Sequence, residues 1–169
     1  MTHIQATIRP ERATDGVAID QLVQRVFGPG MKARAAYALR EGRAHEIWCS
    51  FVAERDDTII GTVRLTPIRV GDTRILMLGP LAVDANFKDL GLGRSLMRAA
   101  IDTAGRDIAH HGFKAVLLVG DLAYYQQFGF RQVPPGGILM PRPVDPQRVL
   151  ICELKRGFAE TVHGIARRD

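Results

Sequence analysis

The sequence predicts a mixed α/β fold with a largely antiparallel twisted sheet, a bulged and splayed central strand, and helices on both faces. Three observations predict it. Residues 47–83 form three strand-like segments joined by short turns. A long amphipathic helix and a continuously apolar strand, at 115–119, come next. Finally, Gly79-Pro80 interrupts the third strand, and because proline has no N–H to donate, that strand must bulge or splay there.

The N-terminal part predicts one strand and one or two helices. Residues 4–9 alternate as a first strand. Thr14 or Asp15 can cap the helix that follows. Its buried face is predicted at Ile19, Leu22, Val23 and Val26. Residues 28–30 break this helix, and the alanines of 32–41 favour a second short helix, with a mobile loop over a site as the alternative.

The strands of the central meander are predicted at 47–53, 59–68 and 74–83, with turns at 55–57 and 71–72. Aspartate occupies both turns, and glycine occupies the second, which suits tight connections. The order of elements along the chain therefore favours antiparallel pairing in this part of the sheet.

The second half of the chain predicts alternating helices and strands. A helix is expected where apolar residues recur four apart, at Leu92, Leu96, Ala100, Ala104 and Ile108. Gly112 stands at its C-terminal cap. Residues 115–119 read as a strand buried on both faces, and 122–128 as a short helix. Five prolines make 133–146 a loop, and 148–154 return as a strand.

Composition bounds the class of protein. The 169 residues, 46% hydrophobic and 24% charged, suit one soluble globular domain over 1–169. No apolar run approaches the ~20 residues of a membrane-spanning helix. The first residues carry charge without an apolar core, so no secretory signal is expected. We therefore expect a cytoplasmic protein with no membrane partner.

Metal and nucleic-acid binding are disfavoured. Cys49 and Cys152 lie far apart in apolar segments, without the clustered Cys and His of a metal site, and are expected to be buried thiols. The net charge of +5 is spread along the chain with no run of four basic residues. A basic nucleic-acid-binding domain would show a stripe or cluster and strongly salt-dependent binding. A small polyanionic cofactor explains the charge equally well.

A glycine loop joins the bulged strand to the long helix. Gly91 and Gly93 allow a ligand to approach the main chain, and free N–H groups at a helix N-terminus attract anions. Lys88 and Arg94 add positive charge. The loop lacks the third glycine of a dinucleotide-binding motif and the Gly-Lys-Ser/Thr of a P-loop. It predicts a phosphate-bearing ligand, with simple packing as the alternative.

Two tyrosines follow the buried strand. A tyrosine on a short helix at that place can point its hydroxyl into a cleft, where its ordinary pKa near 10 keeps it protonated as an acid. Tyr124 and Tyr125 are the candidates. The alternative is that both rings only pack this helix onto the sheet.

These features together resemble the GNAT superfamily of N-acetyltransferases, over roughly residues 4–154. The coenzyme A motif of that family, Gln/Arg-x-x-Gly-x-Gly/Ala, is matched by residues 88–93. Its later pattern, Tyr-x-x-x-Gly-Phe, is matched by Tyr125, Gly129 and Phe130. The chain is similar to a bacterial branch of predicted N-acetyltransferases of unassigned substrate. The resemblance implies a GNAT-like sheet.

The resemblance also implies an activity: direct transfer of an acetyl group from acetyl-CoA to a primary amine of a small molecule or protein, without a metal. Backbone groups of the strand would bind the pantetheine arm and N–H groups of the loop the pyrophosphate. The residues implied for coenzyme A are Leu81, Ala82, Val83, Lys88, Asp89, Leu90, Gly91, Leu92, Gly93 and Arg94. Tyr125 would protonate the departing thiolate.

The chain departs from the family pattern at three points. Lys88 replaces Gln or Arg, which keeps a cation but loses the planar fork. The family's Asn-x-x-Ala step before the tyrosine is absent. No acid lies in 77–83, so the general base is open: it is either ordered water or an acid outside the strand, with Glu46, Glu54 and Asp84 as candidates. A non-catalytic acyl-CoA-binding sensor is therefore the alternative to an enzyme.

The acceptor and the assembly remain open at this point. The family places acceptor specificity in the first helices and late loops, here 27–42 and 133–146. Met140, Arg142 and Pro143 are candidates to line the cleft, with a solvent-facing loop as the alternative. The chain is expected to be a monomer or a homodimer.

Overall fold

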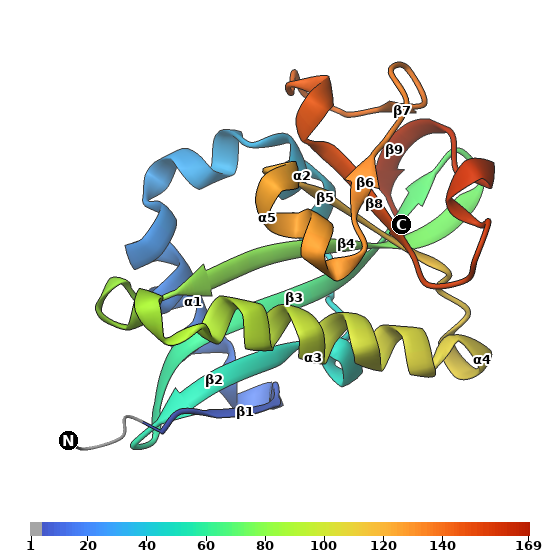
Figure 1. Cartoon of the computed structure of the whole chain (residues 1–169). Helices are drawn as coiled ribbons and strands as arrows, with labels where there is room; N and C mark the ends of the chain where they lie inside the picture. Colours follow the sequence, from blue (N-terminus) through green and yellow to red (C-terminus); the bar gives the residue numbers. More distant parts are fainter. Residues whose placement is uncertain (1–4) are drawn as a thin grey trace.

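The computed structural model describes residues 5–169, so Ile4, where the first strand was predicted to begin, lies outside the described residues (Figure 1). The described strands form one mixed sheet in the order β1-β2-β3-β4-β5-β8-β6, with β9 paired to β3 and β7 to β9. The strands are β1 (Thr7–Pro10), β2 (Phe51–Arg55), β3 (Thr58–Val70), β4 (Thr73–Val83), β5 (Ala115–Val119), β6 (Arg131–Gln132), β7 (Ile138–Leu139), β8 (Val149–Glu153) and β9 (Gly164–Arg168). The mixed α/β fold with a largely antiparallel sheet is confirmed.

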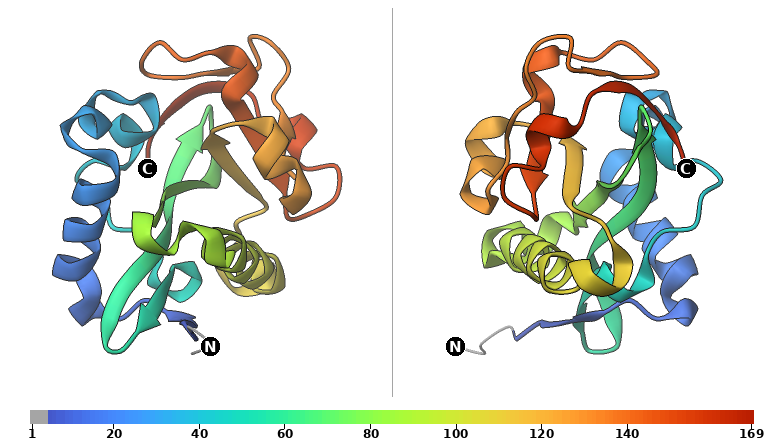
Figure 2. Two further views of the ribbon diagram at one scale, coloured as in Figure 1. Left: turned by 60° about the vertical axis from the view of Figure 1, so that its left-hand side comes forward. Right: turned by 90° about the vertical axis from the view of Figure 1, so that its right-hand side faces the viewer.

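Helices cover both faces of this sheet (Figure 1 and Figure 2). The α-helices are α1 (Gly16–Phe27), α2 (Ala35–Arg40), α3 (Leu92–Arg106), α4 (Ile108–His111) and α5 (Leu122–Tyr125). Short 3₁₀ helices are η1 (Ala13–Asp15), η2 (Pro29–Ala33), η3 (Ile47–Cys49), η4 (Ala85–Leu90), η5 (Gln126–Phe128), η6 (Pro146–Arg148) and η7 (Ala159–Thr161).

Neighbouring residues of β2 show how the two faces are filled. Ala53 packs in a core with Leu92 and Leu96 of α3. Val52 points the other way and packs with Ile19 and Leu22 of α1. This period-two alternation lets one strand support helices on both faces.

The central meander confirms its predicted turns. Asp56 and Asp57, with φ of 49° and 59°, connect β2 to β3, and Gly71, with φ of 56°, connects β3 to β4. Residues 47–49 differ from the prediction of a strand, because they form η3. The hydroxyl of Ser50 donates to Glu46 O at 2.8 Å, and this contact closes a turn before β2 begins.

Helix α1 begins after Asp15, as predicted, but the Asp15 side chain does not cap it. Its carboxylate accepts instead from Arg9 Nη1 and from the Arg12 N–H, each at 2.7 Å. The hydrogen bonds from Arg9 lower the pKa of Asp15 and outweigh the opposing effect of burial. The segment 32–41 is ordered, and it divides into the end of η2 and α2.

The β3–β4 ladder contains the predicted bulge. Val63 pairs with Leu81 and Leu65 pairs with Leu78, so that Gly79 and Pro80 together lie opposite a single β3 residue. Two residues against one is the definition of a β-bulge. The bulge bends β4 at the centre of the sheet and starts the separation described next.

Candidate functional site

Strands β4 and β5 separate in the middle of the sheet. Their parallel pairing is confined to Leu76 with Val116 and Met77 with Leu117. Beyond these pairs β4 continues along β3, whereas β5 stays with β8 as far as Val119. The predicted splay of the central strand is therefore confirmed, and among residues 5–169 no strand lies beside one edge of β4 after Met77.

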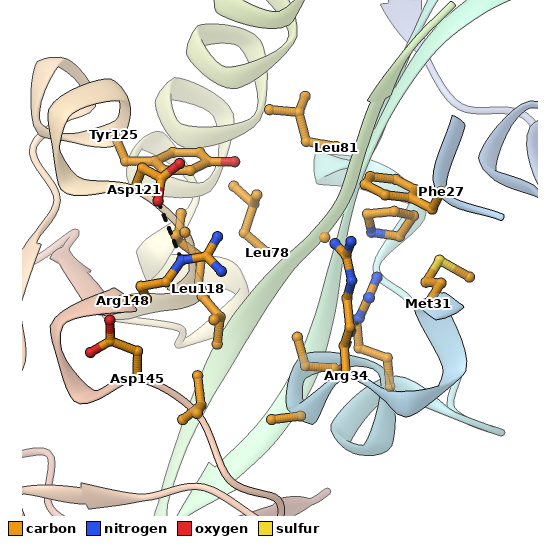
Figure 3. Close-up of a pocket in the computed structure, with 18 of the residues that line it drawn as sticks. Phe27, Met31, Arg34, Leu78, Leu81, Leu118, Asp121, Tyr125, Asp145 and Arg148 are labelled. Atoms are coloured by element: carbon orange, nitrogen blue, oxygen red, sulfur yellow. Dashed lines mark hydrogen bonds and ion pairs between the residues drawn. The ribbon is translucent and has the colours of Figure 1, made fainter. Parts of the chain in front are cut away.

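A cleft of about 560 Å³ lies in this separation (Figure 3). The end of α1, η2 and α2 form one wall, and β4 contributes Leu78 to Leu81. The opposite wall comes from the end of β5, from α5, and from residues 143–145 with Arg148. Since a splayed strand offers backbone groups and side chains surround it, the cleft can bind an extended ligand along β4.

The register of β4 decides which of its backbone groups face the cleft. The Asp84 N–H donates to Ile60 O of β3 at 2.8 Å. Because bonding directions alternate along an antiparallel ladder, Ala82 also faces β3, opposite Thr62, and its side chain is buried under α1. The backbone groups of Leu81 and Val83 therefore point away from β3, toward the separation.

The glycine loop begins α3 beside this edge. Gly91 takes a left-handed conformation, with φ of 70° and ψ of 15°, and ends η4. The first hydrogen bond of α3 runs from the Ser95 N–H to Gly91 O at 3.1 Å. The N–H groups of Leu92, Gly93 and Arg94 thus precede the helical ladder and remain available to an anion.

The side chains of the loop differ in exposure. Leu92 is buried in the core and can offer a ligand only its N–H. Four side chains are exposed: Lys88, Asp89, Leu90 and Arg94. The two cations, Lys88 and Arg94, lie on either side of the glycines, and their charge favours an anionic ligand.

Tyr125 lines the cleft from the β5 side. Figure 3 shows its hydroxyl pointing across the cleft toward Leu81 of β4. Burial raises the pKa of Tyr125 to about 12, and Tyr124 and Asp121 add to the rise. The hydroxyl is therefore protonated at neutral pH and can donate a proton to a group bound along β4.

Tyr124 connects the two motifs. A Cβ atom built on Gly93 would stand 3.0 Å from the Tyr124 hydroxyl, so the ring reaches from α5 to the start of α3. Burial raises the pKa of Tyr124, against the opposing charge of Arg94. Its ring also packs edge-on against Tyr125, with centroids 4.9 Å apart. The Tyr124 side chain thus packs against Tyr125 and also lies next to the glycine loop.

The three candidate bases lie elsewhere. Glu46 accepts from Trp48 Nε1 at 2.8 Å, and Glu54 pairs with Arg9. Asp84 accepts from the Asn86 N–H at 3.0 Å and so caps η4. None of the three lines the cleft.

Two other carboxylates do line the cleft, Asp121 and Asp145. Asp121 lies 3.3 Å from Arg148 Nε, and Asp145 accepts from the Gln147 N–H at 2.9 Å. Asp121 follows the predicted strand 115–119, and Asp145 lies within the predicted loop 133–146. Their approach to the cleft depends on how residues 143–148 fold back beside α5, which no local pattern predicts.

Two arginines of the first wall were also missed, Arg34 and Arg40. Only the assignment of 27–42 to the acceptor side indicated them. Of the late-loop candidates, Pro143 lines the cleft and Met140 does not. Arg142 lies outside the lining, where its Nη1 donates to Lys32 O and joins the late loop to η2.

Metal ligands do not gather in residues 5–169, where no three His, Cys, Asp or Glu residues are placed to hold an ion together. No helix in the same residues is long and apolar enough to cross a membrane. Cys49 and Cys152 are buried free thiols, as predicted.

Known proteins resemble the chain in both sequence and structure. Residues 18–130 match the acetyltransferase (GNAT) family. The chain is 33% identical over 126 residues to the uncharacterized N-acetyltransferase YhbS of Escherichia coli K12, covering 73% of this chain and 72% of that protein.

Solved structures also resemble the chain. The crystal structure of E. coli YhbS in complex with CoA superposes with a TM-score of 0.80 at 27% identity, over 100% of this chain and 92% of that one. A GNAT acetyltransferase from Brucella melitensis in complex with acetyl-CoA gives 0.60 at 28% identity, over 88% and 96%.

Proposed function

The chain belongs to the acetyltransferase (GNAT) family, and we propose that it transfers an acetyl group from acetyl-CoA to a primary amine of a small molecule or protein. The observation that carries the proposal is the separation of β4 from β5, with Tyr125 facing the free edge of β4 across the cleft. We place the reaction in the cytoplasm, which suits two buried thiols that remain unpaired.

The proposed cofactor contacts use the backbone. Leu81 and Val83 would bond the pantetheine amides as a neighbouring strand does; Ala82, which faces β3, is left out of this contact. The pyrophosphate would be held by N–H groups in the loop and the start of α3. The residues of this cradle are Lys88, Asp89, Leu90, Gly91, Leu92, Gly93 and Arg94. The neighbours solved with CoA and acetyl-CoA support the identity of the cofactor.

The chemical step follows from this placement. The nitrogen of a neutral amine forms a bond to the acetyl carbonyl carbon, and the bond from that carbon to sulfur breaks. A main-chain N–H near the bulge stabilises the negative charge that develops on the carbonyl oxygen. Tyr125 gives its proton to the departing sulfur, and the extra proton on nitrogen leaves to water. The tyrosinate then takes a proton back from solvent, which restores the acid. The products are the acetylated amine and free CoA.

The proton that the amine loses would leave along the opposite wall of the cleft, the wall that contains Tyr125. Asp121 and Asp145 border the cleft on the side of Tyr125. Water held between such carboxylates and the amine is positioned to accept a proton. We therefore assign the base function to solvent in this part of the cleft instead of to Glu46, Glu54 or Asp84.

The first experiment is a melting curve with and without acetyl-CoA. A ligand at 100 times its Kd stabilises a protein by about 2.7 kcal/mol, so we expect a clear rise in melting temperature. Release of free thiol with a panel of amines then distinguishes an enzyme from a non-catalytic acyl-CoA sensor. A rise without thiol release from any amine favours the sensor, and no rise in protein shown by mass spectrometry to be free of CoA contradicts the proposal.

A further inference from the structure

We propose that the acceptor is a small amine that carries an oxyanion, a carboxylate or a phosphate, and that Arg34 and Arg40 bind this group. The inference rests on the proposed acyl transfer and specifies its substrate class. The two arginines come from the wall formed by η2 and α2. Figure 3 shows Arg34 on the side of β4 away from Tyr125.

Arg40 lies against the bulge of β4. A Cβ atom built on Gly79 would stand 3.3 Å from Arg40 Nη1, so the guanidinium packs directly onto the glycine backbone. Its Nε donates to Ala36 O at 3.1 Å within α2, which fixes the direction of the side chain. The remaining N–H groups lie beside the point of β4 where the acetyl group is expected, and a bound acceptor would reach them.

In the described residues, no carboxylate neutralises the charges of the two arginines on this wall. Burial is the main cause that lowers the pKa of Arg40 to about 10; Tyr37 opposes this shift, and the charges of Arg64 and Arg34 contribute to it. Arg64 bonds Glu11 Oε1 at 2.8 Å, but in residues 5–169 no carboxylate pairs with Arg34 or Arg40. Arg34 stacks over the ring of Phe27 instead, 5.2 Å from its centroid. Two like charges on one wall repel each other, and an anion bound between them relieves that repulsion.

The opposite wall has the complementary charge. It carries Asp121 and Asp145 on the same side of the cleft as Tyr125, and the only arginine that lines it in the described residues, Arg148, is already paired with Asp121. An acceptor with an amine at one end and an oxyanion at the other matches this polarity. Its amine would lie near the carboxylates and Tyr125, and its anion near the arginines.

The dimensions favour a small molecule. The cleft volume is about 560 Å³. Arg142 Nη1 donates to Lys32 O, which ties the loop of residues 143–145 to η2, so that two lining segments are held together. A polypeptide would need this tie to open, whereas an amino acid or an amino-sugar phosphate fits without that change.

The test compares matched amines in two pools. One pool holds amino acids and amino-sugar phosphates, and the other holds the corresponding amides and unphosphorylated sugars. Each pool is incubated with the protein and acetyl-CoA, and acetylated products are identified by mass spectrometry. We expect products mainly from the anionic pool, with kcat/KM at least ~10-fold higher for an acid than for its amide. Acetylated amino acids would indicate that the site recognises a carboxylate, and acetylated amino-sugar phosphates that it recognises a phosphate.

Variants connect the preference to the site. Arg40→Gln should raise KM for the anionic acceptor about tenfold or more, with kcat nearly unchanged, and Arg40→Lys should restore part of it. Arg43→Gln, an exposed arginine outside the cleft, is the matched control. Retention of the melting shift with acetyl-CoA shows that each variant is folded.

Three outcomes would overturn the inference. Neutral amines could be acetylated as well as anionic ones. Arg40→Gln could lower kcat equally for acids and amides, which would assign Arg40 to the reacting carbonyl. Peptides could be acetylated while the small anionic amines are not. Failure of the proposed function looks different, because no product then forms from either pool although acetyl-CoA is bound.

Discussion

The ring of Tyr125 lies directly against Gly120, where an added Cβ atom would stand 2.3 Å from the ring carbon Cε2. Gly120 follows the last residue of β5, and its N–H donates to Arg148 O at 2.9 Å. The backbone there is held in place, so a side chain at Gly120 would have to displace the ring. The absence of a side chain at Gly120 is what lets the Tyr125 hydroxyl reach the cleft.

Replacing Tyr125 by Phe should lower kcat and leave the affinity for acetyl-CoA nearly intact. A general acid contributes roughly 10²–10⁴ in rate, and because a thiolate is a weakly basic leaving group we expect a loss of ~100-fold. Steady-state thiol release and the melting shift measure the two quantities. Tyr37→Phe, whose ring does not line the cleft, is the control.

The pH profile provides a second readout for Tyr125. With a pKa raised to about 12, the hydroxyl keeps its proton through the whole working range of the enzyme. Loss of this proton should therefore cause no decline of kcat between pH 7 and pH 10. A decline of wild-type kcat above about pH 8 that disappears in Tyr125→Phe would contradict the assignment. So would a Tyr125→Phe variant that loses affinity for acetyl-CoA but keeps the wild-type kcat.

Gly120→Ala should reproduce much of the Tyr125→Phe defect without touching a reactive group. The added methyl requires the ring to move, and the hydroxyl then no longer faces β4. Thiol release should fall by about tenfold or more, while acetyl-CoA still raises the melting temperature. Gly16→Ala is the matched control, because nothing lies within 4 Å of its added Cβ. A Gly120→Ala variant with normal kcat would show that the ring position is unimportant.

Local sequence patterns predicted the parts of the site that depend on neighbouring residues. The apolar segment 115–119 is β5, and Gly79-Pro80 forms the bulge because proline cannot join a ladder there. The turn at Gly91 and the start of α3 at Leu92 also follow from local glycine and periodicity signals.

The missed parts depend on residues far apart in the chain. Strand β9 pairs with β3 through Ile68 and Arg168, a hundred positions apart, and its short segment has no strong alternation. Arg40 is the last residue of α2, and only the path of η2 and α2 across the separation brings it to Gly79. Pairings of this kind are decided by packing of the whole sheet, and composition does not reveal them.

Gly93→Ala should weaken CoA binding, because its Cβ would press on the Tyr124 hydroxyl at 3.0 Å and disturb the first turn of α3. We expect Kd to rise about tenfold, equivalent to ~1.4 kcal/mol, in a calorimetric titration. Gly105→Ala tests the same change in the same helix, where the nearest atom to the added Cβ is 4.0 Å away. The double variant with Tyr124→Phe removes the clash, and it should recover part of the affinity; no recovery would contradict this cause.

Glu11 should support the fold from behind the cleft. Its side chain is 2% exposed, and its Oε1 lies 2.9 Å from His45 Nε2 and 2.8 Å from Arg64 Nη2. Burial alone would raise the pKa of Glu11, but the hydrogen bonds from His45 and Arg64 outweigh it and lower the pKa. Glu11→Gln should therefore reduce the free energy of unfolding at pH 7 by about 2–3 kcal/mol in urea titrations.

The dependence on pH follows from the direction of the Glu11 shift. Because the folded-state pKa is lowered, the contribution of Glu11 is complete above its unfolded pKa of about 4.3, and it is lost as pH falls through the folded value. The stability of wild type should thus fall more steeply below pH ~4.3 than that of Glu11→Gln. Asp20→Asn is the control, because Asp20 also faces Arg64, at 3.4 Å, but is 77% exposed and should contribute less than ~1 kcal/mol. Parallel stability curves for wild type and Glu11→Gln in acid would show that the charge of Glu11 does not stabilise the fold.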